Sequence, residues 1–313
     1  MKTILLLLAA TLVTARAQGP LVPTGPPAPG MKTLDQIEPR KLITTLPLTI
    51  NEPGSYYLAG NIVYSALGVA IGVNASNVTI DLGGFNISST GTANDSCIYI
   101  YSGNNNVRIH NGSITGNTVV TQTGAVSNRT WNVTTAGGFT VGINASESLN
   151  CQFSDLIITG CTNRGLILGA QSAVSSSIFR SNGNCATSVA GRGCTIIDCI
   201  AVLNGNQGGF AGNVAGDNEA TFLHCVSLSN GDEGISAPYS SVTGCQVKDN
   251  GGTGIYAVYG CVTQCVTKDN DFPGVTANNG VISFCRGEGN DIGNGNGELS
   301  ATSGTRVNNY PAP

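Results

Sequence analysis

Asp198 and His224 are the residues of this sequence whose types and spacing best suit proton transfer. Each stands directly before a cysteine, Cys199 or Cys225, and each cysteine is followed five residues later by an asparagine. If the cysteines occupy equivalent positions in successive structural repeats, the carboxylate and the imidazole project from neighbouring strands about 5 Å apart. A carboxylate at that distance can orient an imidazole, so the pair is a candidate general acid/base. A surface hydrogen bond between two exposed polar side chains is the alternative reading.

Three more side chains are candidates for a functional role, two for substrate binding beside this pair and one for proton transfer independently of it. Arg180 and Lys248 are expected on the turns that flank the pair, where their charges could bind a carboxylated sugar. His110 is the second of the two histidines and stands in the segment VRIHNGSITG. It is an independent candidate for proton transfer, with a role as a turn residue as the alternative.

The longest interruption of the repeat covers residues 117–139 and carries Trp131, the only tryptophan, beside Arg129. Loops that leave a rigid scaffold often carry ligand contacts, so both side chains are candidates for substrate binding. The alternative is that the segment is a polar hairpin lying over one flank, with the tryptophan packed to hold it down.

The elements that must position these residues are set by a repeat of 20 residues. Cysteines recur at Cys225, Cys245, Cys265 and Cys285, and asparagines recur at Asn230, Asn250, Asn270 and Asn290. A period of 20 is too short for paired-helix repeats, which need over 30 residues, and leucine-rich signatures are absent. The sequence therefore predicts a β-helix in which each repeat forms one turn.

Parity within the repeat supports this prediction, because a strand sends alternate side chains to opposite faces. Two residues after the cysteine position, none of the side chains is charged: Phe179, Ala201, Ser227, Val247, Thr267 and Gly287. One or three residues after it, charged side chains are frequent: Arg180, Lys248, Lys268, Arg286 and Glu288. Three further apolar columns begin at Ile235, Ala237 and Val242. These columns predict three short strands per turn, with the asparagine at a bend where successive side chains can bond along the axis.

The spacing shifts upstream but the pattern continues through Cys199 with Asn204 and Ser177 with Asn182. On this alignment the residues before the cysteine position are Ser154, Ser176, Asp198, His224, Gly244, Gln264 and Phe284. Together with older, diverged segments further back, the pattern predicts about nine turns.

Eleven cysteines are present, an odd number. In parallel stacking both Cβ atoms point the same way, which opposes the torsion of a disulfide, so the cysteines on the 20-residue spacing are expected to be buried thiols. Cys151 with Cys161 and Cys185 with Cys194 are the better disulfide candidates. No metal is assigned to the cysteine column, because the repeats lack nearby histidines.

The repeats, with PGSYYLAGNI from Pro53 and VTIDLGGFNI from Val78, resemble the right-handed parallel β-helix proteins of the pectin-lyase-like superfamily over residues 55–290. The resemblance implies an all-β, right-handed, single-stranded parallel β-helix of three sheets. The superfamily includes polysaccharide lyases, hydrolases and uronate epimerases, alongside adhesins and phage tail proteins, and the fold alone does not choose among them. The chain lacks the acidic cluster of calcium-dependent pectate lyases, the aspartate trio of polygalacturonases and the Asp-Pro-His-Asp motif of mannuronan epimerases.

The predicted organisation begins with a signal peptide over residues 1–17, with cleavage after Ala17 at an A-x-A site. A Pro/Gly-rich linker and N-terminal segment follows over 18–42, then the β-helix over 43–290, then a Gly/Asn/Ser-rich tail over 291–313. The protein is therefore expected to be secreted, either extracellular or periplasmic. No later stretch is apolar enough to span a bilayer, so membrane insertion is not expected.

Charge and surface composition set expectations for partners. Loss of Lys2 and Arg16 with the signal peptide leaves 12 basic and 18 acidic residues, a formal charge of −6 that disfavours nucleic acid. No cofactor is identified, although calcium would suit an acidic run formed by Asp217, Glu219, Asp232 and Glu233. An outward apolar strip is expected to be covered, either by a loop or the tail of the same chain or by side-by-side self-association: Ile178, Ile200, Val202, Val226, Leu228 and Val266.

Two functions follow from these observations. The first is a secreted β-helix that binds or processes a polysaccharide, as a lyase, an epimerase or a hydrolase. The second is a non-catalytic structural, adhesive or cell-surface β-helix. Scarce charge and the missing catalytic motifs favour the second, whereas the family resemblance and the pairing of Asp198 with His224 favour the first. The sequence leaves open whether the protein is an enzyme.

Overall fold

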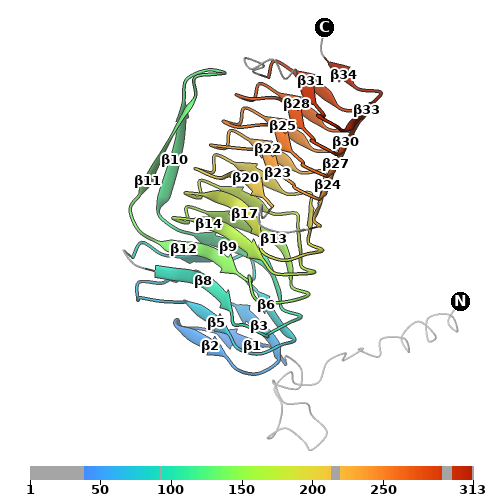
Figure 1. The fold of residues 1–313 in the computed structure, drawn as a ribbon. Helices are drawn as coiled ribbons and strands as arrows, with labels where there is room; N and C mark the ends of the chain where they lie inside the picture. The colour runs from blue at the N-terminus through green and yellow to red at the C-terminus, as the bar shows by residue number, and fades with distance from the viewer. Residues whose placement is uncertain (1–38, 92–93, 213–218, 291–297, 312–313) are drawn as a thin grey trace, which may run out of the picture. The chain divides into compact units, whose positions relative to one another are not determined.

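The computed structural model describes residues 39–91, 94–212, 219–290 and 298–311. The predicted signal peptide and almost all of the predicted linker lie outside the described residues. Within them the chain coils as a right-handed parallel β-solenoid of short strands (Figure 1). The prediction of an all-β parallel β-helix with three sheets is confirmed.

Each full turn contributes one strand to each of three faces, which we call face one, face two and face three in chain order. Face three is an 11-stranded parallel sheet among the described residues. Its strands are β2 (Leu48–Ile50), β5 (Ile71–Val73), β8 (Asn94–Ile100), β12 (Phe139–Asn144), β14 (Arg164–Leu168), β17 (Cys185–Val189), β20 (Gly208–Ala211), β23 (Ile235–Ser236), β26 (Ile255–Tyr256), β29 (Val275–Thr276) and β32 (Leu299–Ser300).

Faces one and two are joined because β9 and β13 are long enough to run through both. Face one contains β1 (Lys41–Ile43), β3 (Gly54–Leu58), β6 (Val78–Asp81), β9 (Arg108–Thr115), β13 (Gln152–Thr159), β15 (Ala173–Ser175), β18 (Thr195–Ile197), β21 (Thr221–Leu223), β24 (Ser241–Thr243), β27 (Cys261–Thr263), β30 (Val281–Ser283) and β33 (Thr305–Val307). Face two adds β4 (Ile62–Val63), β7 (Asn86–Ser88), β16 (Ile178–Arg180), β19 (Ile200–Val202), β22 (Val226–Leu228), β25 (Gln246–Lys248), β28 (Val266–Lys268), β31 (Arg286–Glu288) and β34 (Tyr310–Pro311).

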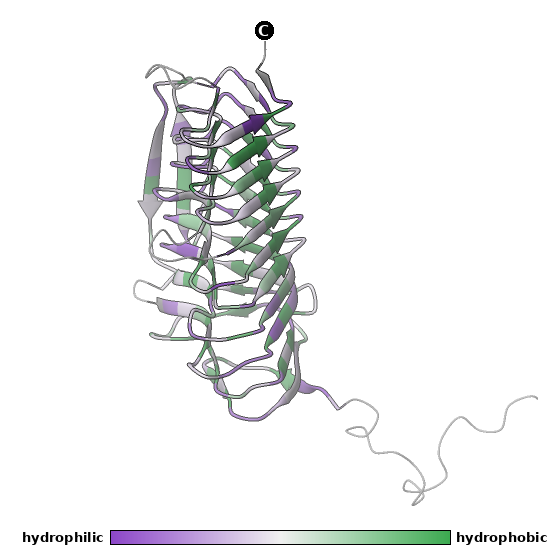
Figure 2. Ribbon diagram, turned by 45° about the vertical axis from the view of Figure 1, so that its right-hand side comes forward, coloured by the Kyte–Doolittle hydropathy of each residue, from purple (hydrophilic) through white to green (hydrophobic). Residues whose placement is uncertain are grey.

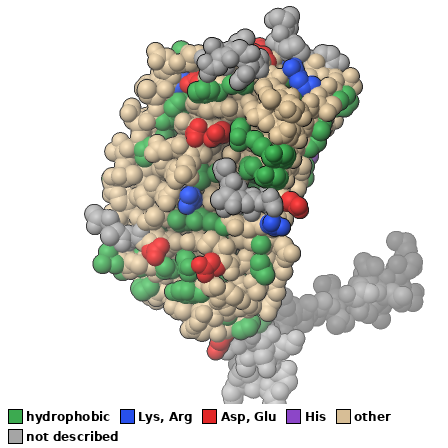
Figure 3. Space-filling model, viewed as in Figure 1, with side chains coloured by type: hydrophobic (Ala, Val, Ile, Leu, Met, Phe, Trp, Pro, Cys, Tyr) green, Lys and Arg blue, Asp and Glu red, His purple; other side chains and the backbone are tan. Residues whose placement is uncertain are grey.

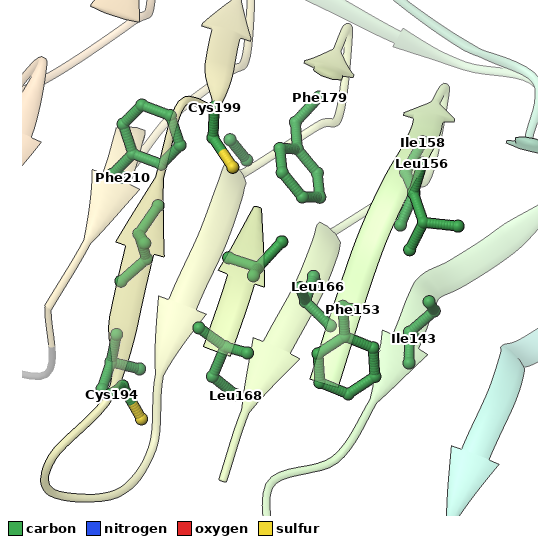
Figure 4. Close-up of a cluster of buried hydrophobic side chains, with 14 of the residues drawn as sticks. Ile143, Phe153, Leu156, Ile158, Leu166, Leu168, Phe179, Cys194, Cys199 and Phe210 are labelled. Atoms are coloured by element: carbon green, nitrogen blue, oxygen red, sulfur yellow. The ribbon is translucent and has the colours of Figure 1, made fainter. Parts of the chain in front are cut away.

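The interior is a continuous column of apolar side chains, as parity predicts. The residues two after the cysteine position are buried, and so are the columns that begin at Ile235, Ala237 and Val242. Apolar strands stack along the axis in Figure 2, and aromatic rings such as Phe153, Phe179 and Phe210 fill the wider central turns (Figure 4). The outward positions of Arg180, Lys248 and Arg286 are exposed. The inward and outward assignments are therefore confirmed.

The stacked asparagines form a hydrogen-bonded ladder inside the bend between faces two and three. The side-chain amide of each donates to the Oδ1 atom of the next, at 3.0 Å from Asn182 to Asn204 and 2.9 Å from Asn250 to Asn270. The backbone N–H of each asparagine donates to the same oxygen, at 3.1 Å for Asn182 and 3.1 Å for Asn250. The ladder satisfies polar groups that would otherwise be buried without partners, and it keeps successive turns in register.

All eleven cysteines are free thiols, and only Cys261 is exposed. The disulfides expected between Cys151 and Cys161 and between Cys185 and Cys194 are absent. The eight-residue strand β13 lies between Cys151 and Cys161, which holds their Cα atoms well beyond the roughly 7 Å limit for a disulfide. Burial raises the pKa of Cys161 to about 12, so its thiol is neutral at ordinary pH and packs as a small apolar group.

The stack is longer than the sequence analysis predicts. Face three has eleven strands within the described residues, where about nine turns were expected. The sequence predicts a tail beyond Asn290, yet β32, β33 and β34 add another turn that pairs with β29, β30 and β31. Leu299 takes the place of Val275 in the buried column there, and the Gly/Asn-rich composition before it hid this match.

Candidate functional site

The structure brings Asp198 and His224 together, as the repeat alignment predicts. They occupy the bend between faces one and two on successive turns, where both backbones adopt the left-handed region with φ of 51°. The Nδ1 atom of His224 lies 3.6 Å from Oδ1 of Asp198. The side chains are 65% and 59% exposed. This is an open surface pair with little shelter from water, and neither residue lines either of the two cavities described below.

The structure corrects one position of the repeat alignment, which predicts that Ser154 occupies this bend on its turn. The residue there on β13 is Asp155, with φ of 54°, and not Ser154. Leu156 takes the cysteine position, because its N–H donates to the hydroxyl of Ser177 on the next turn. Ser154 therefore points outward from face one.

Arg180 and Lys248 lie on turns that flank the Asp198 and His224 pair, as expected. The register runs from Arg180 through Val202 and Leu228 to Lys248 on face two. Three strand spacings, about 14 Å, separate the backbones of these two residues. Their role in binding a carboxylated sugar stays a prediction. Lys248 already contacts the carboxylate of Asp249 at 3.3 Å.

The interruption over residues 117–139 is an antiparallel hairpin of β10 (Thr118–Thr123) and β11 (Thr130–Thr135), which runs along the stack in Figure 1. Arg129 is 5% exposed and contacts Asp249 and Asp271 at 2.8 Å each. Trp131 donates its indole N–H to the carbonyl of Ser229 at 2.8 Å. These contacts hold the hairpin against the bend that carries the asparagine ladder, beside Asn230, Asn250 and Asn270. They support the alternative of a packed hairpin, because both side chains already bind other residues of the same chain.

The apolar strip lies on face two at the predicted outward positions. Ile178 is 37% exposed and Val266 is 44% exposed, while the other four members are partly buried. The side-by-side self-association that this strip suggests stays a prediction.

A groove of about 780 Å³ lies over face three, and sequence analysis missed it. Its floor is a straight row of outward side chains that are register partners on five successive strands: Ile167, Ser188, Ala211, Ser236 and Tyr256. Four strand spacings give the row a length of about 19 Å. Small side chains fill its centre, and a larger one stands at each end. This shape suits a ligand that is extended along the axis.

Polar and charged groups line the groove beside its floor. At one end the guanidinium of Arg164 donates to Oε1 of Gln207 at 3.3 Å, and Asp232 and Glu233 lie further along. Burial, followed by the nearby charge of Asp232, raises the pKa of Glu233 to about 7. Charged side chains are few and scattered on the side of the molecule shown in Figure 3, which makes these groups distinctive. A carboxyl group with this pKa can donate or accept a proton near neutral pH.

His110 has a carboxylate neighbour that the sequence analysis did not find. Asp81 is its register partner on β6, and Oδ1 of Asp81 lies 3.9 Å from Nδ1 of His110. Only the register between diverged turns reveals this pair, because no repeated cysteine or asparagine marks those turns.

The acidic run is the segment expected to bind calcium. Asp217 lies outside the described residues. Among the residues that the structure describes, no group of three or more His, Cys, Asp or Glu side chains is placed to hold a metal ion. Calcium dependence is thus a matter for experiment.

The stack of coils, with its polar outer faces and long groove, defines a right-handed parallel β-solenoid. Residues 139–296, half of the chain, match the family described as the right-handed β-helix region, and the chain belongs to that family. The resemblance to right-handed parallel β-helix proteins is therefore confirmed. No curated protein sequence matches the chain.

Several solved structures share the fold. ORF18 of Geobacillus virus E2 is 13% identical with a TM-score of 0.59, over 86% of this chain and 54% of that one. The A-module of the mannuronan C-5 epimerase AlgE4 of Azotobacter vinelandii is 11% identical with a TM-score of 0.57, over 83% and 87%. The tailspike gp49 of Acinetobacter baumannii bacteriophage Fri1, a capsular polysaccharide depolymerase, is 11% identical with a TM-score of 0.51, over 82% and 51%.

The chain spans about half the length of the viral protein and of the tailspike. At these identities the similarity establishes the fold. Within the described ranges, the structure has no helix that is long and apolar enough to cross a membrane.

Proposed function

We propose that this protein binds an extended polysaccharide in the face-three groove and processes it there, with Glu233 as the proton-transferring group. The observation that carries the proposal is the floor row of five register partners from Ile167 to Tyr256. A groove about 19 Å long with a flat, small-residue centre accommodates several consecutive sugar rings, whereas a compact metabolite would fill only part of it.

The polar groups along the groove support a role in chemistry as well as in binding. Arg164 presents a cation that would attract a carboxylated sugar by a charge-assisted hydrogen bond. Glu233, with a pKa of about 7, is suited to protonate a leaving oxygen in hydrolysis or to exchange a proton with a sugar carbon in elimination or epimerisation. The chemistry of the epimerase and the depolymerase that share this fold agrees with such a substrate. The reaction type is left open.

Blocking the groove tests the binding step. Ser188→Trp places an indole in the centre of the floor, and Ser241→Trp places one at an outward position on face one as the matched control. Affinity electrophoresis against acidic and neutral polysaccharides, with and without calcium, should show retardation of the wild type and of Ser241→Trp, but not of Ser188→Trp. Equal retardation of all three proteins would place binding elsewhere on the surface.

Removing the proton-transferring group tests the processing step separately. Glu233→Gln should keep binding and lose product formation, with Glu219→Gln, an exposed carboxylate outside the groove lining, as the control. Wild type that binds but releases no product would favour the second function, a non-catalytic adhesive or structural β-helix.

Export is part of the proposal, because residues 1–17 have the composition of a cleaved signal peptide. The mature protein recovered outside the cytoplasm should begin at Gln18. Recovery of the intact N-terminus from the cytoplasm would contradict it.

A further inference from the structure

The outer surface of face one carries an aspartate, a histidine and a serine in one row. The groove floor lies on another face of the solenoid, face three. Asp81 on β6 is the register partner of His110 on β9, and His110 is the register partner of Ser154 on β13. Side chains at partnered positions of parallel strands project side by side about 4.8 Å apart. The three residues come from positions 29 and 44 residues apart along the chain, so only the coiling brings them together.

The carboxylate of Asp81 is held in place by its own set of contacts. Its Oδ1 atom accepts the backbone N–H of Gly83 at 2.8 Å and the side-chain amide of Asn111 at 3.0 Å. Its Oδ2 atom lies 3.4 Å from the guanidinium of Arg40. The same Oδ1 atom is 3.9 Å from Nδ1 of His110, and both side chains are about one-fifth exposed. This fixed carboxylate lies on the Nδ1 side of the ring, and Ser154 is the register partner of His110 on the next strand.

A cavity of about 420 Å³ adjoins the row on the same face. Its lining includes Arg108 and Gln152, which precede His110 and Ser154 by two positions and therefore point outward with them. Two residues along a strand span about 6–7 Å, so the guanidinium and the amide lie one outward position away from the serine on the same face. Both are hydrogen-bond donors of the kind that stabilises an oxyanion.

We propose that Asp81, His110 and Ser154 form a hydrolytic site for carboxylic esters. The Oγ atom of Ser154 bonds to the ester carbonyl carbon as its proton passes to Nε2 of His110. The bond to the alcohol oxygen then breaks, and that oxygen takes the proton from His110, which leaves an acyl group on Ser154. A water molecule gives a proton to His110 and attacks the acyl carbon; the bond to Oγ breaks, and the proton returns to Ser154. Ester and water yield an acid and an alcohol, with no other reactant.

The contact between Asp81 and His110 is longer than a hydrogen bond, and such contacts in unliganded sites commonly tighten when substrate binds. The site lies on face one and the polysaccharide groove on face three, so the two proposals stand or fall separately.

Hydrolysis of p-nitrophenyl acetate by the full chain tests the proposal, together with labelling by a fluorophosphonate, which bonds to an activated serine with loss of fluoride. Ser154→Ala and His110→Asn should each lose about 1,000-fold or more of the wild-type kcat/KM. Ser175→Ala is the matched control, because Ser175 is the next register partner on the same face, and it should hydrolyse as the wild type does. Tandem mass spectrometry should place the label on Ser154.

Three results would overturn the proposal: no hydrolysis and no label with the wild type, an undiminished rate for Ser154→Ala, or a label on any other residue. Circular dichroism and the unfolding midpoint of each variant establish that it is folded, and the label adds a readout in the wild-type protein that needs no variant.

Discussion

The ionisation of Glu233 should make the stability of this protein depend on pH in a defined direction. Burial and the charge of Asp232 raise the pKa of its carboxyl from 4.5 to about 7 in the folded state. The folded protein therefore holds this proton more tightly than the unfolded chain does. Stability from this group is fully present below pH 4.5 and is lost as the pH rises through about 7, where the carboxylate must be charged in the fold.

The size of the effect follows from that displacement of the pKa. Moving it from 4.5 to about 7 corresponds to at most about 3 kcal/mol. Because Glu233 is only partly buried, solvent screening reduces the expected contribution to about 1–2 kcal/mol. Glu233→Gln, which stays neutral, should thus be more stable than the wild type by about 1–2 kcal/mol at pH 8.5 and should show no such advantage at pH 4.

Urea unfolding of both proteins at pH 4, 5.5, 7 and 8.5 measures this difference. The control Glu219→Gln changes an exposed carboxylate and should show a difference that does not vary with pH. A difference between Glu233→Gln and the wild type that is the same at all four pH values would refute the reasoning, since it would mean that the folded and unfolded states bind this proton equally.

Three further outcomes are expected. Asn250→Ala leaves the buried N–H of Asn230 without its acceptor and should lower the free energy of unfolding in urea by about 3–5 kcal/mol. The control Asn132→Ala, at an exposed position, should lower it by under about 0.5 kcal/mol. Equal losses in the two variants would show that the ladder does not stabilise the fold. Arg129→Met leaves the carboxylates of Asp249 and Asp271 without their shared cation. Amide hydrogen exchange over residues 118–135 should then become faster, while exchange in the solenoid strands stays the same. An unchanged exchange rate in the hairpin would show that other contacts hold it in place. Leu166→Ala opens a cavity in the closed interior and should cost about 2–5 kcal/mol; a smaller loss would mean that the turns collapse around it.

The fold could be predicted because every turn of a solenoid has the same pattern of buried and exposed side chains. Between Gly234 and Asn290 the turns have equal length, so the buried columns and the asparagine ladder can be aligned directly. The same alignment brought Asp198 beside His224. It failed by one residue at Ser154, because Leu156 takes the position that cysteine or serine occupies in the following turns. It missed the last turn because a Gly/Asn-rich segment of different length precedes Leu299.

The groove could not be predicted because its floor depends on turns of unequal length. The floor residues Ile167, Ser188, Ala211, Ser236 and Tyr256 are separated by 21, 23, 25 and 20 residues, and an error of one residue in any interval sends the side chain inward. His110 could be selected as a candidate from the sequence, but its pairing with Asp81 could not be predicted, for the same reason. Arg129 and Trp131 were recognised as unusual, but their partners lie about 100 residues or more away in sequence.

The most direct test of the central claim is incubation of the protein with a panel of acidic and neutral polysaccharides, with and without calcium, followed by mass spectrometry of the soluble products. We expect new oligosaccharides or, for an epimerase, deuterium incorporated from heavy water, with both lost in Ser188→Trp and Glu233→Gln and kept in Ser241→Trp. Unchanged polymers throughout the panel, or product formation that survives a blocked groove, would contradict the claim that this groove processes a polysaccharide.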